Sequence, residues 1–439
     1  MFNIRSLDID RPPIGQIIKD LREYRGMSQE TLARAALFNR STLSQIELGN
    51  IDCPDDLLLA LKTALDVEYL PLRELERLDF QDMLHKWYSV ISERKLEEAK
   101  KIQEKLSVVK LIPHDRELNL LYSLFECRLF LGLNQLADAK VILDSFDDSI
   151  DELNETQLYH YYCNQGTFNV RSKHNREALD YYLKAYALMK FGFDKNIILY
   201  FNIAICYSRL GFSAHAASFL EEASKVLPDS PRNVPEFSIW SSLAVRYIEL
   251  GALQRAKMLL DKCHELMSND YKTSLHENSN TYLGIVLLNY GYLYRKSRKW
   301  IISIEYLNKS LELFDKEDVN YLESLYQKIR CYIEMGNILP CTAFLSNGLR
   351  LSEGNELYSI MFKSLQMIIS LNDESAKYLE NNILPYLLES RELILALDYT
   401  MVLRDYYKTK GRGFKIKALA LSDTACSITD DMYEGGVVE

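Results

Sequence analysis

A small residue recurs at nearly constant spacing along most of this chain of 439 residues. It stands at Ala99, Ala137, Ala178, Ala216, Ala256, Ser303, Cys341, Ala376 and Ala418, at intervals of 38, 41, 38, 40, 47, 38, 35 and 42 residues. Each one follows an apolar, aromatic-rich segment and a turn, as in LGFSAHA. A small side chain at a fixed place lets two antiparallel helices approach closely. A repeat of this length therefore predicts a solenoid of about nine helical hairpins over residues 85–426.

The repeated units resemble tetratricopeptide repeats with slightly long connections. That resemblance implies a right-handed solenoid in which the first helix of each hairpin lines a concave groove. The composition also favours helices, because the chain contains only 17 Gly and 10 Pro but 29 Tyr. The expected fold class is all-α throughout the chain.

The N-terminal part has a different pattern, with short amphipathic helices separated by tight turns. Its first apolar positions follow helical spacing at Ile14, Ile17, Ile18 and Leu21. Gly26 ends this helix, and Ser28 is placed to cap a second one. A third helix is predicted over residues 40–48, closed by Gly49, and a fourth over residues 57–65.

The predicted third helix has an unusual polar face. Leu43 and Ile46 can face the core, and no acidic residue lies between Glu30 and Glu47. The other side presents Asn39, Arg40, Ser41, Thr42, Ser44 and Gln45. Short or forked hydrogen-bonding groups of this kind are what base edges and phosphates require in a major groove. The alternative interpretation is a small helical domain whose polar face happens to be neutral.

The run LREYRGMSQETLA, followed by STLSQIELG, resembles the helix-turn-helix domain of the phage-repressor and Cro type, also called XRE. The resemblance implies a DNA-binding domain over residues 1–67, with Gln29 at a phosphate. It also implies that Arg22 and Glu47 form a buried ion pair. The candidate DNA-binding residues are Gln29, Asn39, Arg40, Ser41, Thr42, Ser44 and Gln45.

The charge of the chain restricts how this domain could bind DNA. The chain carries a net charge of −10, and residues 1–66 hold 8 Lys and Arg against 10 Asp and Glu. Such a domain gains little non-specific attraction to phosphates. We therefore expect a homodimer or higher oligomer that reads a pseudo-palindromic site in double-stranded DNA.

Several classes of protein are disfavoured. The beginning, MFNIRSLDID, lacks the features of a signal peptide, and no apolar run is long enough to span a bilayer, which predicts a cytoplasmic protein without a membrane partner. The eight cysteines and seven histidines are dispersed, which predicts no metal site and no cofactor. The chain contains no phosphate-binding, metalloprotease or nucleophile-elbow motif, so we do not expect an enzyme.

A column of polar residues falls midway along the predicted first helices, fourteen positions before each small residue. It consists of His85, Ser123, Asn164, Asn202, Ser242, Asn289, Gln327, Phe362 and Arg404. Amide side chains both donate and accept, which suits binding an extended peptide backbone. The alternative is that these amides cap or bridge neighbouring helices.

A second column, seven positions before the small residues, contains Arg171, Arg209, Glu249, Lys296 and Glu334, with Arg330 one turn before Glu334. Arginine can bind peptide carboxylates through two hydrogen bonds, although charges at helix ends are often only solvated. The predicted peptide site comprises Asn164, Asn202, Asn289, Gln327, Arg171, Arg209, Arg330 and Arg404.

The complete layout resembles the Rap/Rgg/NprR/PlcR/PrgX (RRNPP) group of quorum-sensing receptors, in particular its PlcR and NprR branch. The expected domains are helix-turn-helix, residues 1–67; helical connector, 68–84; repeats, 85–426; and an acidic flexible tail, 427–439. The resemblance implies a transcription regulator controlled by a short signalling peptide. The alternative function is an interaction protein that sequesters a protein partner, such as a phosphorelay component.

Overall fold

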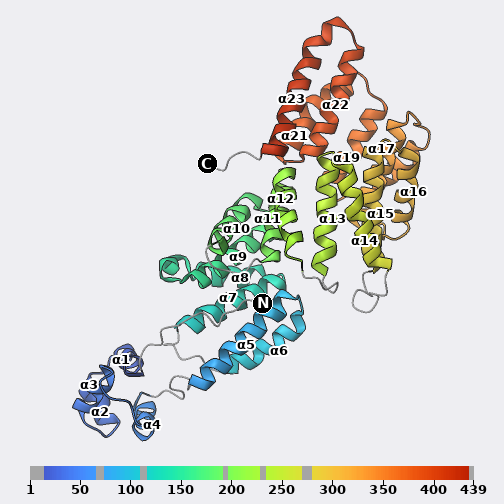
Figure 1. The fold of residues 1–439 in the computed structure, drawn as a ribbon. Helices are drawn as coiled ribbons and strands as arrows, with labels where there is room; N and C mark the ends of the chain where they lie inside the picture. Colours follow the sequence, from blue (N-terminus) through green and yellow to red (C-terminus); the bar gives the residue numbers. More distant parts are fainter. Residues whose placement is uncertain are drawn as a thin grey trace. The chain divides into compact units, whose positions relative to one another are not determined.

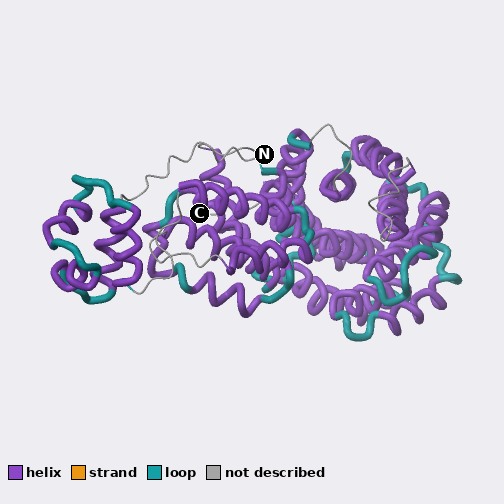
Figure 2. Tube along the Cα trace, turned by 90° about the horizontal axis from the view of Figure 1, so that it is seen from below, coloured by secondary structure: helices purple, strands orange, loops and turns teal. Residues whose placement is uncertain are grey.

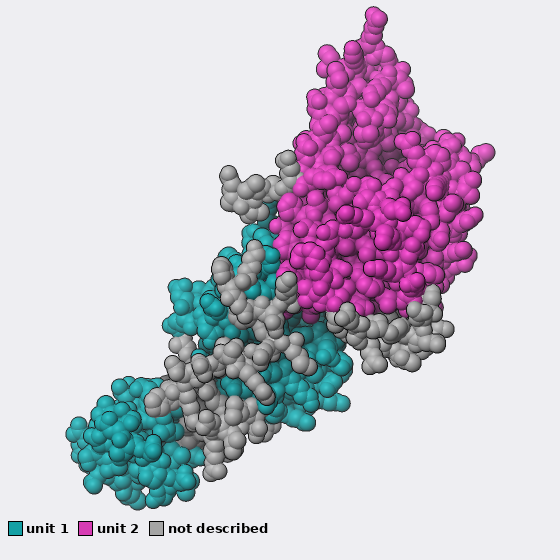
Figure 3. Space-filling view, viewed as in Figure 1, with its two compact units in different colours: residues 1–194 teal, residues 195–439 magenta. Residues whose placement is uncertain are grey.

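The computed structural model describes residues 14–65, 74–108, 116–190, 196–227, 234–268 and 279–434. Every regular element in these ranges is a helix (Figure 2). The chain divides into two compact units, residues 1–194 and residues 195–439 (Figure 3). No helix in the described ranges is long and apolar enough to cross a membrane.

The N-terminal helices are α1 (Ile14–Tyr24), α2 (Gln29–Ala35), α3 (Arg40–Glu47) and α4 (Asp55–Ala64) (Figure 1). Ser28 caps α2 by accepting a hydrogen bond from the backbone N–H of Thr31. Gly49 follows α3 with φ +73°, a conformation that glycine adopts without strain. The four helices enclose their own apolar core, which includes Ile18, Leu43 and Leu61.

The rest of the first unit consists of three hairpins. They are α5 (Glu74–Ser92) with α6 (Leu96–Val108), α7 (Arg116–Gly132) with α8 (Leu136–Asp144), and α9 (Glu155–Arg171) with α10 (Asn175–Lys190). A 3₁₀ turn, η2 (Asp147–Glu152), precedes α9. Because α5 begins at Glu74, residues 74–84 belong to the first hairpin and are not a separate connector. Residues 68–73 of the predicted connector lie outside the described residues.

The second unit contains six further hairpins in its described ranges. The first four are α11 (Ile197–Arg209) with α12 (Ser213–Lys225), α13 (Val234–Glu249) with α14 (Leu253–Ser268), α15 (Ser279–Lys296) with α16 (Trp300–Leu311), and α17 (Val319–Glu334) with α18 (Cys341–Leu351). The fifth pairs α19 (Glu356–Ile369) with α20 (Asp373–Tyr378), η4 (Leu379–Ile383) and α21 (Leu384–Glu389). The sixth is α22 (Leu393–Thr409), η5 (Arg412–Phe414) and α23 (Lys415–Glu434).

The last two hairpins contain one irregular helical turn and a final helix that is longer than predicted. The π-helical turn η4 directly precedes Pro385, which has no N–H to donate to the helical ladder. The predicted flexible tail from residue 427 is wrong for residues 427–434, because they continue α23. Ile428 and Met432 are buried in this part of the helix, with only 3% and 2% of their surface exposed. Residues 435–439 lie outside the described residues.

Close helix pairing explains the recurring small residues. Trp87 on α5 donates to the carbonyl of Ala99 on α6 at 2.9 Å, and both residues are fully buried. Ala178, Ala216, Ala256, Ser303, Cys341 and Ala376 are likewise fully buried. The second hairpin differs, because Ala137 is exposed and Ala139 occupies the buried place. The small-residue register predicted at Ala137 is therefore wrong by two positions.

The final hairpin does not contact only its neighbours. Arg391, just before α22, donates to the carbonyl of Leu210 at the end of α11 at 2.9 Å. Tyr433 near the end of α23 donates to the carbonyl of Leu250 at 3.3 Å, and α23 packs on α12 (Figure 1). The second unit therefore closes on itself, whereas an open solenoid contacts only successive repeats.

Candidate DNA-binding helix and candidate peptide site

Helix α3 is fixed tightly against α1. A Cβ atom at Gly15 would overlap the carbonyl oxygen of Ile46, so the two helices touch through backbone. The guanidinium of Arg22 donates to both carboxylate oxygens of Glu47, at 2.7 and 3.0 Å. Both side chains are buried, and the hydrogen bond from Arg22 to Glu47 contributes most to raising the pKa of Arg22. The predicted buried ion pair is present.

The outer face of α3 is polar, as the sequence predicts. Leu43 and Ile46 are fully buried under the helix. Asn39, Arg40, Ser41 and Gln45 are exposed, while Thr42 and Ser44 are half-buried. Gln45 accepts a hydrogen bond from the amide of Asn50 at 2.8 Å, which orients its side chain at the surface. The side chains of Asn39, Arg40 and Ser41 are exposed to solvent, where they could contact another molecule.

Gln29 has a structural contact that the sequence did not indicate. Its amide donates to Glu47 at 2.7 Å, on the same carboxylate that binds Arg22. Its side chain therefore joins the start of α2 to the end of α3, and a phosphate contact for Gln29 stays a prediction.

The polar column on the first helices contains two amides that bridge neighbouring hairpins. Asn164 on α9 donates to the carbonyl of Leu124 on α7 at 2.7 Å. Asn289 on α15 donates to the hydroxyl of Ser241 on α13 at 3.0 Å. Both side chains are buried, which fits the alternative interpretation that these residues join helices. Among the described residues, no group donates to either amide oxygen.

The other two amides of the column differ from each other. Asn202 is half-buried on α11, and its amide has no hydrogen-bond partner in the described parts of the chain. Gln327 on α17 donates to Glu323 at 2.7 Å and accepts from Arg295 at 2.6 Å. Asn202 is therefore the amide of this column that is freest to bind a ligand.

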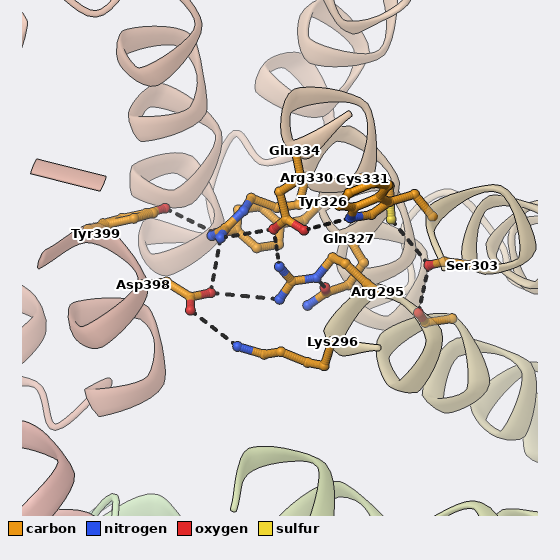
Figure 4. Close-up of polar contacts among 12 residues, drawn as sticks. Arg295, Lys296, Ser303, Tyr326, Gln327, Arg330, Cys331, Glu334, Asp398 and Tyr399 are labelled. Atoms are coloured by element: carbon orange, nitrogen blue, oxygen red, sulfur yellow. Dashed lines mark hydrogen bonds and ion pairs between the residues drawn. The ribbon is translucent and has the colours of Figure 1, made fainter. Parts of the chain in front are cut away.

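Arg330 belongs to a buried charge cluster that joins α15, α17 and α22 (Figure 4). Its guanidinium lies 3.1 Å from Asp398 and 3.3 Å from Glu334. Asp398 also pairs with Lys296 at 3.2 Å and with Arg295 at 3.7 Å. Burial alone would raise the pKa of the Asp398 carboxyl, but Arg330, Lys296 and Arg295 outweigh it and hold this pKa well below its usual range.

The other predicted arginines are spread over the chain. Arg404 on α22 pairs with its neighbour Asp405 at 2.7 Å and is absent from the charge cluster. Arg209 is exposed at the end of α11. Arg171 is exposed at the end of α9 and donates to Asn134 at 3.1 Å.

Arg171 has two arginine neighbours that the sequence did not single out. Burial and the nearby charges of Arg94 and Arg128 lower the pKa of Arg171. Arg128 donates to Thr167 at 2.6 Å. None of the three forms an ion pair within the described residues, so this part of the first unit has cationic groups without a carboxylate partner.

Asp398, Arg295 and the pair Arg94 and Arg128 are the main residues that the sequence reasoning missed. Asp398 lies outside both polar columns, and its partner Lys296 is 102 positions away. Lys296 and Glu334 did stand in the second column, and this periodicity was the available signal. Nothing local in the sequence marks Asp398 as their partner.

Comparison with known proteins supports this organisation. Residues 14–75 match the family model of a helix-turn-helix domain. Regulatory protein RapD of Bacillus subtilis is 24% identical over 339 residues, which cover 75% of this chain and 93% of RapD. Transcriptional activator NprA of Geobacillus stearothermophilus is 22% identical over 385 residues, which cover 84% of this chain and 92% of NprA.

Solved structures agree in fold. The apo form of the quorum sensor NprR from B. thuringiensis matches with a TM-score of 0.64 at 19% identity, covering 80% of this chain and 99% of that one. NprR in complex with its cognate peptide NprX matches with a TM-score of 0.62 at 20% identity, covering 80% and 100%. The chain therefore has a helix-turn-helix domain followed by helical repeats whose fold is similar to that of NprR.

Proposed function

We propose that this protein is a cytoplasmic DNA-binding transcription regulator controlled by a short linear signalling peptide that binds the first helices of its repeats. A homodimer would place two α3 helices on a pseudo-palindromic site in double-stranded DNA. The observation that carries the proposal is the polar face of α3, held by the Arg22–Glu47 pair and joined in one chain to a column of amide side chains on the first helices of the repeats.

The DNA-binding part rests on the chemistry of α3. Arg40, Ser41 and Gln45 are exposed groups that can meet phosphates or base edges, and the apolar side of the helix is fully buried. Because Gly15 brings the backbone of α1 against α3, the helix cannot shift without disrupting the domain. A rigid helix of this kind suits docking in the major groove.

The peptide-binding part rests on the amide column and on the arginines. Asn164 and Asn289 are oriented by the hydrogen bonds they donate, which leaves each amide oxygen to accept from a peptide N–H. Asn202 can both donate and accept. Arg94, Arg128 and Arg171 can bind carboxylates of the peptide directly, whereas Arg330 can do so only if a peptide carboxylate replaces Asp398. NprR, which shares the fold, is known in complex with its cognate peptide.

The DNA-binding proposal is tested by selection from a random library of double-stranded DNA. We expect the full chain to enrich pseudo-palindromes and Arg40→Ala or Gln45→Ala to relax base preference, at about 1–3 kcal/mol for each lost base contact. Lys62→Ala, on α4, is a matched control for loss of a basic side chain away from α3. Enrichment of the same sequences by a chain that lacks residues 1–66 would contradict the proposal.

The peptide-binding proposal is tested by calorimetry with synthetic fragments of short secreted peptides encoded beside the gene. Asn202→Ala should weaken binding by about ten-fold or more, because a peptide group loses its partner. The stability of the variant should stay unchanged, since this amide has no partner within the described chain. Asn164→Ala is the control that removes an inter-helix hydrogen bond and lowers stability. Unchanged affinity in Asn202→Ala would place the ligand elsewhere.

A second candidate function is capture of a protein partner such as a phosphorelay component. The observation that favours it is the match to RapD, a regulatory protein, over 93% of RapD. A chain without residues 1–66 discriminates the two functions. It should lose DNA binding in either case, and it would keep a regulatory effect in the cell only if partner capture is the function.

A further inference from the structure

The final hairpin, α22–α23, has an apolar core of its own. Leu403, Tyr407 and Met432 are almost fully buried in it, together with residues of the preceding α20–α21 segment. The core of α13–α15 is a separate cluster, and the core of α17–α19 meets this one only through partly buried side chains such as Leu357 and Leu395. Because its buried apolar surface lies mostly within itself and α20–α21, this hairpin can keep its structure while its position changes.

The contacts that join this hairpin to α15 and α17 combine a charge cluster with limited apolar packing of Leu395 on the α17–α19 core. Asp398 supplies the carboxylate for Arg330, Lys296 and Arg295, which all come from those two helices. Glu334 is the other carboxylate of the cluster (Figure 4). Without Asp398, three cations would share this single carboxylate and would repel one another. One hydroxyl pair, Tyr326 with Tyr399 at 3.2 Å, accompanies the charges.

A second set of contacts holds the hairpin to α11–α12. The guanidinium of Arg391 lies over the ring of Phe212, 4.8 Å from its centroid, and donates to the carbonyl of Leu210. Arg391 also pairs with Asp431 on α23 at 3.2 Å. Leu393 packs so closely on Gly211 that a Cβ there would lie 2.7 Å from it.

We propose that α22–α23 is a movable closing element of the second unit, held in the closed position by Asp398 at one contact and by Arg391 at the other. Each of these side chains bridges the hairpin to helices far away in sequence. Loss of either contact weakens the docking of the hairpin, so that it leaves the closed position more often while its own core remains folded. Release opens the ring that the second unit forms.

The closing element gives ligand binding a means to change the shape of this unit. A ligand carboxylate at Arg330 would replace Asp398, so that ligand binding and release of the hairpin are the same exchange of partners. This link to a peptide rests on the proposed function. The movement itself rests only on contacts within the second unit.

Hydrogen–deuterium exchange of the full chain, without DNA or peptide, tests the movement. The variants are Asp398→Asn and Arg391→Gln. The control is Asp405→Asn, which changes an exposed carboxylate on the same helix that pairs only locally with Arg404 and Lys408. Arg391→Gln leaves the buried charge cluster intact, so it tests the movement even if Asp398→Asn unfolds the unit.

We expect exchange in residues 393–434 to rise by about ten-fold or more in Arg391→Gln and Asp398→Asn, because the undocked hairpin is stabilised only by its own core and opens locally more often, with α13–α16 and the first unit unchanged. Asp398→Glu should restore part of the protection, and Asp405→Asn should match the wild type. Unchanged exchange of the hairpin in Arg391→Gln, or an equal rise across α11–α19, would overturn the proposal. Neither result would touch the proposed DNA and peptide binding, because neither ligand is present.

Discussion

Glu47 joins three segments of the N-terminal domain through one carboxylate. It accepts hydrogen bonds from Arg22 on α1 and Gln29 on α2, and it lies itself at the end of α3. Because the carboxylate is buried, these donors take the place of water as its hydrogen-bond partners. These hydrogen bonds therefore add to the apolar core and to the Gly15–Ile46 contact in fixing the position of the candidate recognition helix.

Glu47→Ala should lower the free energy of unfolding of this domain by about 3–5 kcal/mol, because the buried Arg22 would lose its buried carboxylate and keep only the exposed Glu23 as an ion-pair partner. Glu30→Ala is the matched control, since Glu30 forms an exposed ion pair with Arg34 at 3.6 Å and should cost below about 1 kcal/mol. Thermal and chemical unfolding of the two variants measures the difference. Equal stability of both variants would contradict a structural role for the buried pair.

The hairpins depend on close contact between their helices, and glycines on the first helices mark where it is greatest. Gly291 on α15 faces Leu307 on α16, which is fully buried, and Gly166 on α9 faces the ring of Tyr182 on α10. At both places a Cβ would lie less than 3 Å from the partner side chain. These pairs fix how near the two helices of a hairpin can lie.

Gly291→Ala should destabilise the second unit by about 1–3 kcal/mol, because the fully buried Leu307 would have to shift away from the added Cβ. Gly413→Ala is the control, since no atom lies within 4 Å of a Cβ at that position. Chemical unfolding followed by circular dichroism measures both variants. A Gly291→Ala protein as stable as Gly413→Ala would show that the interface adapts without cost.

The stabilisation that Asp398 gives to the second unit should be lost as the pH falls. The folded-state pKa of Asp398 lies below its unfolded value, so the charge cluster stabilises the unit above the unfolded pKa and loses this effect as pH falls. The stability difference between wild type and Asp398→Asn should stay constant from about pH 5 to 8 and shrink below about pH 4. Unfolding at a series of pH values measures it. A difference that grows on acidification would contradict the charge assignment.

Local sequence patterns predicted the elements better than their long-range partners. The helical spacing from Ile14 to Leu21, and Gly49 after α3, correctly marked the N-terminal helices. In the second hairpin, two small residues two positions apart made the register ambiguous, and the exposed Ala137 was chosen in place of Ala139. Arg330 was predicted to bind a peptide carboxylate, but in the structure it pairs with Glu334 on its own helix and with Asp398 on a helix that no repeat register connects to it.

At the scale of the whole molecule, charge limits how the protein can meet DNA. The net charge is −10, and residues 1–66 are themselves slightly acidic. A single domain of this kind forms few phosphate contacts and should bind weakly at cellular salt. If the subunits are paired, the second domain binds the same duplex at a high effective concentration. The dimer then binds much more tightly than a single domain, although each domain makes the same contacts.

We therefore expect a dimer on DNA, with half-sites about one helical turn or a multiple apart. Light scattering of the full chain with a selected duplex should give two chains for each duplex. Inserting about half a helical turn between the half-sites should abolish tight binding, whereas inserting a full turn should restore part of it. A single chain bound to each duplex at micromolar protein concentration would refute this expectation.

The closure of the second unit also has a consequence for synthesis of the chain. Hairpins that contact only their neighbours can fold one after another as they leave the ribosome, because their contacts are local. The hydrogen bonds from Arg391 to Leu210 and from Tyr433 to Leu250 span 181 and 183 positions. They form only after nearly the whole chain has been translated. Until then, the surfaces of α11 to α14 that receive the last hairpin stay uncovered, and the newly made protein reaches its closed form in a late, separate folding step.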